Sequence, residues 1–316
     1  MTRFEGNTNL NPTTAMRPLV RILGQILGGL VVVVLLGLAS VQVFSTNRLA
    51  KTFEISDSSP PIPSDSASVA RGRHLVRAIT RCVECHGEDL GGRVVVERPS
   101  VGRITARNLT TGIGGWGTTL SDAAIVEAIR HAVSPTGRAL ALMPARGYWH
   151  LSDNDVAAIV AYVRSVPPVD RDLPLTSYSF RGRTLLVTGR LDDMFDARAI
   201  DHKARREPAP APDTTEAYGR YLANIGGCTW CHGSDLAGKP IPLALPDGPI
   251  STNITPASLG SWSESDFFRA MREGIRPDGR ALDTTYMAVR YLRELTDLEL
   301  RALWKFLRSL PPQNRS

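Results

Sequence analysis

The sequence is poor in cysteine and in aromatic residues, and it contains no concentrated run of charge. Only four of its 316 residues are cysteine, and the aromatic residues together make up 6%. Such sparse aromatics suggest that something else fills part of the core. The net charge is +6, yet the 37 lysines and arginines are scattered. Nucleic-acid binding is therefore a weak interpretation, and electrostatic docking to an acidic partner is a better one.

Recognisable catalytic motifs are also missing. Serine, histidine and aspartate residues are scattered without the context of a nucleophile or acid–base constellation, and no glycine-rich phosphate loop occurs. Strand-forming patterns are poor throughout, and only Thr184–Val187 looks extended. With 27 glycines and 22 prolines, we expect a mainly helical protein with many turns and short elements.

One long apolar segment lies near the N-terminus. Ile22–Phe44 carries no charge and exceeds the about 20 helical residues that cross a hydrocarbon core. Arg17 and Arg21 precede it, and the positive-inside rule keeps that end in the cytoplasm. We predict a cytoplasmic tail at 1–21, a single transmembrane anchor at 22–44 in the inner membrane, and a periplasmic remainder. A cleaved signal peptide is the alternative, although the apolar stretch is longer than a usual signal-peptide core.

The rest of the chain is organised as an internal repeat behind a Pro/Ser-rich linker at 45–68. CVECHG in the first half corresponds to CTWCHG in the second, and PTGRAL corresponds to PDGRAL. Each half closes with a capped helical pattern that ends before two prolines. We predict two homologous domains at 69–168 and 214–316, joined by an interdomain linker at 169–213.

The two hexapeptides hold every cysteine of the chain in the pattern C-x-x-C-H. This pattern is typical of covalent haem c attachment. Two sulfurs at this spacing can add to the two vinyl groups on one edge of a porphyrin, and the following histidine projects onto the iron. We therefore predict two covalently bound haems c. The predicted attachment residues are Cys82, Cys85, Cys228 and Cys231, and the predicted proximal ligands are His86 and His232.

Three other interpretations of the cysteines compete with haem attachment. A thioredoxin-like redox pair needs a βαβ context, which the sequence lacks. A four-cysteine zinc site would have to join pairs that lie far apart in the chain, and it would leave the histidines unexplained. Disulfides are permitted outside the cytoplasm, but pairing within C-x-x-C would constrain very little chain.

The second axial ligand of each iron is predicted from the repeat. Met143 lies nine residues before Ser152, and Met287 lies nine before Thr296, where each C-terminal helix begins. We expect these two methionines to ligate the irons, with simple core packing as the alternative. Histidine is the rival ligand type. His74, His131, His150 and His202 remain, and His131 is the one to test for bis-histidine ligation.

From about residue 69 to its end, the chain resembles a dihaem cytochrome c made of two class I-type domains. It is similar to the membrane-anchored cytochrome subunits that accompany periplasmic dehydrogenases. The shared features are CVECHG, CTWCHG, N-[LI]-T, GRAL and the late methionine. The resemblance implies an all-α fold of two tandem cytochrome c-like domains, in which the first and last helices cross. It also implies that six residues lie near the haems: Asn108, Trp116, Arg138, Asn253, Trp262 and Arg280.

The predicted ligand set indicates the function. Histidine and methionine together saturate the iron, and the thioether raises its reduction potential. We expect a one-electron relay from a periplasmic dehydrogenase or soluble redox carrier to a membrane respiratory acceptor. A dihaem enzyme, such as a peroxidase or a sulfur-compound dehydrogenase, is the alternative, and one of its haems would be expected to lack methionine. A membrane-anchored haem sensor is a third reading, but the sequence has no signalling segment.

Overall fold

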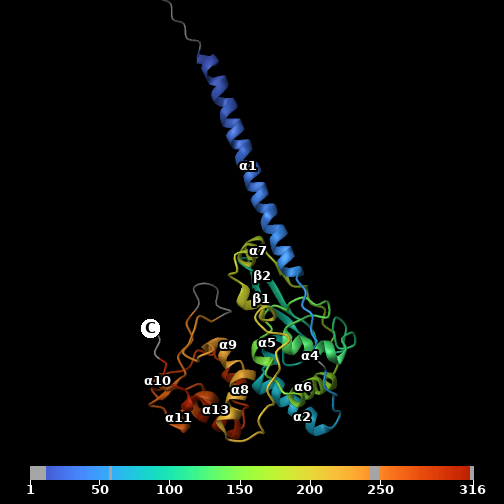
Figure 1. Ribbon diagram of the computed structural model, residues 1–316, viewed down its shortest axis with the longest axis vertical. Coiled ribbons are helices and arrows are strands. Elements are labelled where there is room, and N and C mark those ends of the chain that lie inside the picture. Colours follow the sequence, from blue (N-terminus) through green and yellow to red (C-terminus); the bar gives the residue numbers. More distant parts are fainter. Residues whose placement is uncertain (1–11, 57–58, 242–248, 314–316) are drawn as a thin grey trace, which may run out of the picture.

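The computed structural model describes residues 12–56, 59–241 and 249–313, with the backbone alone for 12–19. One long helix, α1 Pro12–Ala50, projects from a body of short helices (Figure 1). Within α1, Val20–Ala50 is long and apolar enough to cross a membrane, and its apolar side chains are exposed. The predicted span at 22–44 lies inside this helix. Of the predicted tail at 1–21, residues 1–11 lie outside the described residues, and the remainder already belongs to α1.

The first group of helices in the body carries the first C-x-x-C-H motif. Helix α2 runs into one π-helical turn, η1, and a left-handed residue then separates η1 from the motif helix α3. The elements are α2 Ser66–His74, η1 Leu75–Ile79, α3 Cys82–His86, α4 Asp122–His131, α5 Ala145–Tyr148 and α6 Asp153–Ser165.

A second group of helices follows the same order around the second motif. Its elements are α8 Glu216–Ile225, α9 Cys228–His232, α10 Pro256–Leu259, α11 Glu264–Glu273, α12 Val289–Leu292 and α13 Asp297–Ser309. Caps predicted from the sequence open the last helix of each group. Ser152 accepts from the Asp155 backbone N–H, and Thr296 from that of Glu299.

The first and last helices of each group cross at a glycine. Helix α2 packs on α6, and α8 packs on α13. A Cβ built on Gly72 would lie 1.9 Å from the carbonyl oxygen of Ala158, and one built on Gly219 would lie 2.0 Å from that of Ala302. Only a residue without a side chain allows this approach of two backbones.

The two groups share one hydrophobic core and a partly buried ionic cluster. The core joins residues such as Ile159 of the first group to Leu303 of the second. Arg71 pairs with Asp155 at 3.0 Å and with Glu299 at 3.5 Å. His74 Nε2 lies 2.9 Å from Glu299 Oε2, and the Glu299 side chain is 4% exposed. Charges from both groups therefore meet where they pack together.

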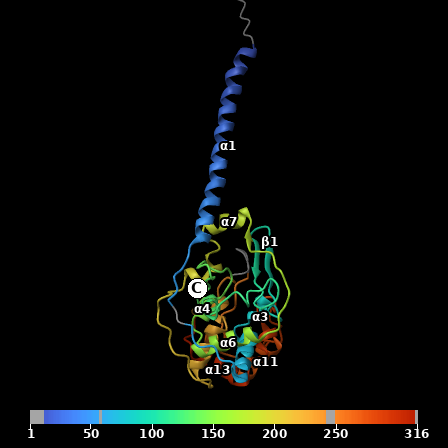
Figure 2. The same ribbon diagram turned by 90° about the vertical axis from the view of Figure 1, so that its right-hand side faces the viewer.

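The segment between the two groups is folded rather than a free linker. It contains β3 Ser177–Tyr178, α7 Phe180–Val187 and two 3₁₀ turns, η2 Asp192–Met194 and η3 Asp196–Arg198. Strand β1 Arg93–Arg98 pairs antiparallel with β2 Gly102–Ala106, and β2 pairs with β3. The view in Figure 2 shows α7 and this small sheet on the side of the body from which α1 emerges.

The mainly helical expectation is confirmed, but two details of the backbone differ from what the sequence indicated. The described chain contains a small three-stranded sheet that the strand-poor sequence did not indicate. Thr184–Val187 was expected to be extended but is helical, because Ser179 caps α7 by accepting from the Gly182 N–H. Leu186 then buries its side chain against Val101 and Phe195 in a second core. Capping and burial outweigh the extended preference of this short run.

The predicted linker at 45–68 is also shorter than expected. Helix α1 continues to Ala50, and α2 already begins at Ser66. Between them, the Phe53 N–H donates to the carbonyl of Gly137 at 2.8 Å.

Replacing the crossing glycine tests the packing of the first group. We expect Gly72→Ala to lower stability by about 1–3 kcal/mol, because two backbones must separate to admit the methyl group. Denaturant unfolding of the detergent-solubilised protein measures this loss. Gly29→Ala in α1 is the matched control, since nothing lies within 4 Å of its Cβ position. Equal unfolding midpoints for the two variants would contradict the close crossing.

Glu299 makes the stability of the fold depend on pH. Burial alone would raise the pKa of Glu299, but the hydrogen bond and charge of His74, together with the hydrogen bonds from Thr296, outweigh it and hold the pKa below the ordinary 4.5. A carboxyl with a lowered pKa stabilises the fold above its unfolded pKa, and this stabilisation is lost as the pH falls through the folded value.

We therefore expect Glu299→Gln to cost about 1–3 kcal/mol near neutral pH. This cost should shrink as the pH falls below 4.5. The measurement is the unfolding midpoint of the parent and of Glu299→Gln, taken from neutral pH to below pH 4.5. The exposed pair of Glu264 with Arg301 supplies the control, because Glu264→Gln should change little at any pH. A pH-independent loss in Glu299→Gln would show that its carboxylate charge is unimportant.

Candidate functional site

Each C-x-x-C-H motif forms a separate one-turn helix. A residue with left-handed backbone precedes it, Arg81 with φ 53° and Gly227 with φ 70°, and so ends the preceding helical segment. A glycine with φ above 80° follows it, Gly87 or Gly233. Residues three and four apart share one face of a helix. The two cysteines and the histidine of each motif are therefore presented on one face.

The four cysteines are free thiols, and none forms a disulfide. Burial raises the pKa of Cys85 to about 11, and it also raises the pKa of Cys82, Cys228 and Cys231. Among the described residues, which include all four cysteines, no group of three or more His, Cys, Asp or Glu could hold a metal ion. The thiols thus form neither a structural disulfide nor a four-cysteine zinc site.

Both motif histidines are held in the tautomer that can ligate iron. His86 Nδ1 lies 2.8 Å from the carbonyl oxygen of Arg107, and His232 Nδ1 lies 2.7 Å from that of Thr252. Burial lowers the pKa of both rings, so each imidazole is neutral. Because a carbonyl can only accept, Nδ1 carries the proton, and Nε2 keeps its lone pair for a metal.

The loop after each motif brings that carbonyl to the histidine. The Gly92 N–H donates to the carbonyl of His86, and the Gly238 N–H donates to that of His232, both at 2.7 Å. A Cβ on Gly92 would lie 2.6 Å from the Ala106 oxygen, and one on Gly238 would lie 2.3 Å from a backbone oxygen. Both glycines have positive φ. They let the returning strand or loop approach the motif.

The two methionines predicted as ligands lie in separate turns of the same type, one in each group. The carbonyl of Met143 accepts from the Ala145 N–H, and that of Met287 accepts from the Val289 N–H, both at 2.8 Å. The residue inside each turn has φ and ψ of −80° and 57° after Met143, and −76° and 48° after Met287. These angles define an inverse γ-turn. Proline therefore helps to fix the turn after Met143, but alanine adopts it after Met287.

The rival histidines have partners of their own. His131 is fully buried, and its Nδ1 lies 3.0 Å from Nδ1 of His202. His202 Nε2 in turn donates to the carbonyl of Ala197 at 2.9 Å. His74 contacts Glu299, and the His150 ring stands edge-on to Trp149.

The two asparagines implied by the resemblance support the backbone. Asn108 accepts from the Thr110 N–H and donates to the carbonyl of Val169 at 2.7 Å. Asn253 accepts from the Thr255 N–H and donates to the carbonyl of Gln313 at 2.6 Å. Each one ties the loop after the motif to the chain that follows the last helix of its group.

The aromatic and arginine residues implied by the resemblance lie in different settings. The Arg107 guanidinium stands 5.0 Å from the Trp116 ring, and Trp262 packs against the shared core. Arg138 and Arg280 are exposed on matching turns.

Four residues that the sequence reasoning missed carry buried N–H groups without a hydrogen-bond partner among the described residues. They are Arg81 Nε, Arg107 Nε, Trp149 Nε1 and Arg269 Nε. Arg107 is adjacent in sequence to Asn108, and its own carbonyl orients His86. An alignment of the two repeats could have drawn attention to Arg81, because the matching position before the second motif is occupied by a glycine, Gly227, and not by a second arginine.

These features fit haem c. Each motif offers two neutral thiols beside an imidazole with a free Nε2 lone pair, and unpartnered buried donors lie in both groups. Such donors are what a bound group with acceptor oxygens would satisfy. This combination of fold and site defines a c-type cytochrome.

Comparison with known proteins agrees with this class. Residues 67–163 match the family described as cytochrome c oxidase, cbb3-type, subunit III. The chain is 28% identical over 284 residues to the fructose dehydrogenase cytochrome subunit of Gluconobacter japonicus, covering 81% of this chain and 55% of that one. It is 30% identical over 285 residues to the cytochrome c subunit of the quinone alcohol dehydrogenase of Gluconacetobacter polyoxogenes, covering 79% and 57%.

A third relative, of which this chain covers a larger share, shows the family. The dihaem c-type cytochrome of Cereibacter sphaeroides is 31% identical over 220 residues, which are 63% of this chain and 68% of that one. The chain belongs to the cytochrome c family that includes this protein and the cytochrome subunits of dehydrogenases. It spans just over half the length of the two dehydrogenase subunits.

Proposed function

We propose that this protein is a membrane-anchored electron carrier that holds two haems c. The first haem is attached to Cys82 and Cys85, and the second to Cys228 and Cys231. The proposed axial ligands are His86 and Met143 for the first iron, and His232 and Met287 for the second. When bound, haem c supplies a one-electron couple between ferric and ferrous iron. A histidine–methionine pair leaves oxygen and peroxide no open coordination position.

The pair of histidine hydrogen bonds is the observation that supports this proposal most. In both motifs Nδ1 donates to a backbone carbonyl at 2.7–2.8 Å, and in both the thiols are free. This arrangement orients each ring and strengthens Nε2 as a ligand. It occurs twice in one chain with the same loop hydrogen bonds, which supports two haem domains at 69–168 and 214–316.

The proposed partners follow from the relatives and from α1. Two relatives are named as cytochrome subunits of dehydrogenases that act on fructose and alcohol. We infer that α1 anchors the chain in the inner membrane with its haem region in the periplasm. Electrons would then come from a periplasmic dehydrogenase or a soluble redox carrier and leave to a membrane respiratory acceptor. The net charge of +6 suits an acidic surface on such a donor.

The two motifs are linked by Arg81, the residue before Cys82. Its Nη2 donates to the carbonyl of Gly226 at 3.1 Å, two residues before Cys228. Its Nη1 lies 3.5 Å from Glu84 Oε2. The same guanidinium is close enough to lower the pKa of Cys228 and Cys231 against the larger effect of burial. A fixed positive charge therefore lies between the two proposed attachment sites.

Removing either methionine should open one iron. We expect Met143→Ala and Met287→Ala each to bind CO at one haem while both haems stay covalently attached. Optical CO titration of the ferrous protein measures this. Met271→Ala, which removes a methionine that packs in α11, is the matched control and should bind no CO. If neither ligand variant binds CO better than the parent, the axial assignment fails. CO binding and peroxide turnover by the parent itself would favour a dihaem enzyme.

The position of Arg81 predicts a shared effect on both haems. A nearby positive charge favours ferrous over ferric iron, so Arg81→Met should lower both midpoint potentials, and Arg81→Lys should largely preserve them. Spectroelectrochemical titration provides the measurement. Arg73→Met removes the same charge from an exposed position on α2 and should shift the potentials much less. A shift confined to one haem would show that Arg81 does not serve both sites.

A further inference from the structure

The end of α1 is fixed to the body by hydrogen bonds in both directions. Arg48 donates to the carbonyls of Leu186 and Val187 at the end of α7, at 2.6 and 3.2 Å. Arg183 of α7 donates back to Ser45 Oγ at 3.0 Å, and Ser45 is fully buried. Arg198 donates to the carbonyl of Arg48 at 3.1 Å. The C-terminal end of α1 is therefore tied to the body by several hydrogen bonds.

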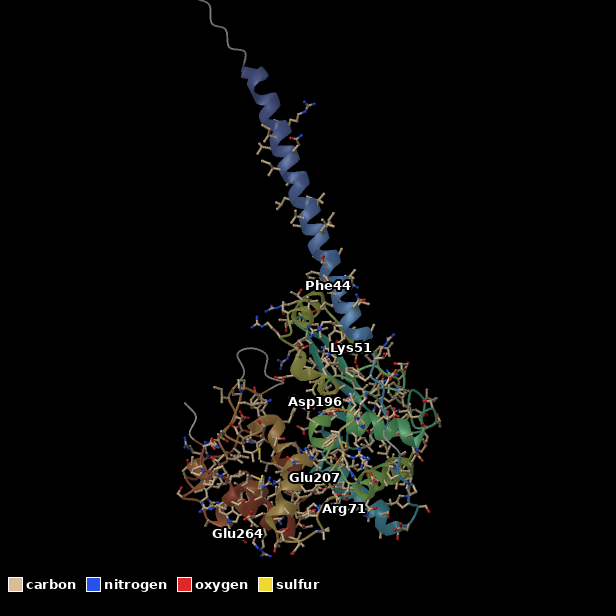
Figure 3. All side chains as sticks on the ribbon, viewed as in Figure 1. Phe44, Lys51, Arg71, Asp196, Glu207 and Glu264 are labelled. Atoms are coloured by element: carbon tan, nitrogen blue, oxygen red, sulfur yellow. The ribbon has the colours of Figure 1, made fainter. Side chains whose placement is uncertain are left out.

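This bracing sets the level of α7 relative to the apolar helix. In two views at right angles, α7 lies beside the last turns of α1, on the face of the body from which α1 emerges (Figures 1 and 2). Phe44, where the predicted span ends, is labelled at that same level (Figure 3). If α1 crosses a bilayer, α7 is therefore held where the hydrocarbon meets the headgroups.

Helix α7 is two-sided in a way that suits this position. Gly182 and Leu186, four residues apart, are buried against the body. The Phe180 side chain at the start of the helix is 50% exposed. Arg181 and Arg190 are exposed on the helix and just after it. An aromatic ring beside arginines is the combination found at membrane interfaces, where the ring sits among headgroups and the cations meet phosphates.

We propose that α7 lies on the outer surface of the bilayer, with Phe180 among the lipid headgroups and Arg181 and Arg190 on the phosphates of anionic phospholipids. This inference rests on the proposed membrane anchor. A lipid surface is favoured over a protein partner because α7 lies beside the exposed apolar surface of α1, including Phe44, which is 59% exposed. Contact at α7, together with the braced α1, would fix the orientation of the haem region on the membrane.

Nitroxide labels on the full-length holoprotein test the proposal. With the native cysteines bonded to haem, Phe180→Cys provides a single thiol. The protein is placed in nanodiscs of phosphatidylcholine, with or without phosphatidylglycerol. The ratio of the label's accessibility to oxygen to its accessibility to a water-soluble nickel chelate then reports the depth of the label in the bilayer. Ser265→Cys, on α11 beside Glu264 at the far end of the body (Figure 3), is the aqueous control. Leu35→Cys within α1 is the control for the span.

We expect the label at position 180 to be shielded from the chelate, the label at 265 to be fully accessible, and the label at 35 to be deepest. Phosphatidylglycerol should increase the shielding at 180, and Arg181→Glu combined with Arg190→Glu should abolish that increase. A shielded label at 35 with an accessible label at 180 would overturn this inference but not the membrane anchor. The exposed side of α7 would then be available to a protein partner. Accessible labels at both 35 and 180 would instead remove the membrane anchor.

Discussion

The hydrogen bond from Nδ1 of each motif histidine to a backbone carbonyl is the interaction on which the site depends. An imidazole has two nitrogens, and a neutral ring has one proton, so committing Nδ1 as donor leaves Nε2 as the only lone pair for a metal. The carbonyls of Arg107 and Thr252 are fixed acceptors because the loops that carry them are hydrogen-bonded to the motif helices. The loop glycines, which would clash if they carried a Cβ, make that approach feasible.

The rest of the body holds these two sites in a fixed relation to each other and to α1. Arg81 links the first motif to the carbonyl before the second, and the cluster of Arg71, His74 and Glu299 joins the helices behind them. The segment between the two groups binds the end of α1 through Arg48 and Arg183. Electron transfer requires short and constant separations rather than conformational change. A structure braced at each junction suits that requirement.

The sequence predicted the elements that depend on local pattern. C-x-x-C-H marks both motif helices, Ser152 and Thr296 mark the start of the last helices, and the apolar run marks α1. Each of these features needs only residues that are neighbours in the chain. Met143 and Met287 occupy matching positions in the sequence repeat, and the structure places each in an inverse γ-turn. Only a bound haem can test their role as ligands.

Features that depend on contacts distant in sequence were missed. The β1–β2–β3 sheet forms around the segment that brings Arg107 back to His86. The β-branched run Val94–Val96 favours a strand, but no local pattern shows that β2 also pairs with Ser177–Tyr178, far along the chain. Thr184–Val187 is helical because Ser179 caps the helix and Leu186 is buried in the same apolar cluster as Val101. The bracing of α1 depends on carbonyls at the end of α7, and no side-chain pattern reveals such acceptors.

The most direct test of the central claim is the mass of the full-length protein expressed together with a haem-maturation system. Two covalently attached haems should be found on the parent, and a single haem after Cys82→Ala with Cys85→Ala or after Cys228→Ala with Cys231→Ala. A pyridine haemochrome assay on the same samples should give the matching ratio of haem to protein. A colourless protein with the mass of the bare polypeptide, or a parent with one haem, would contradict the account.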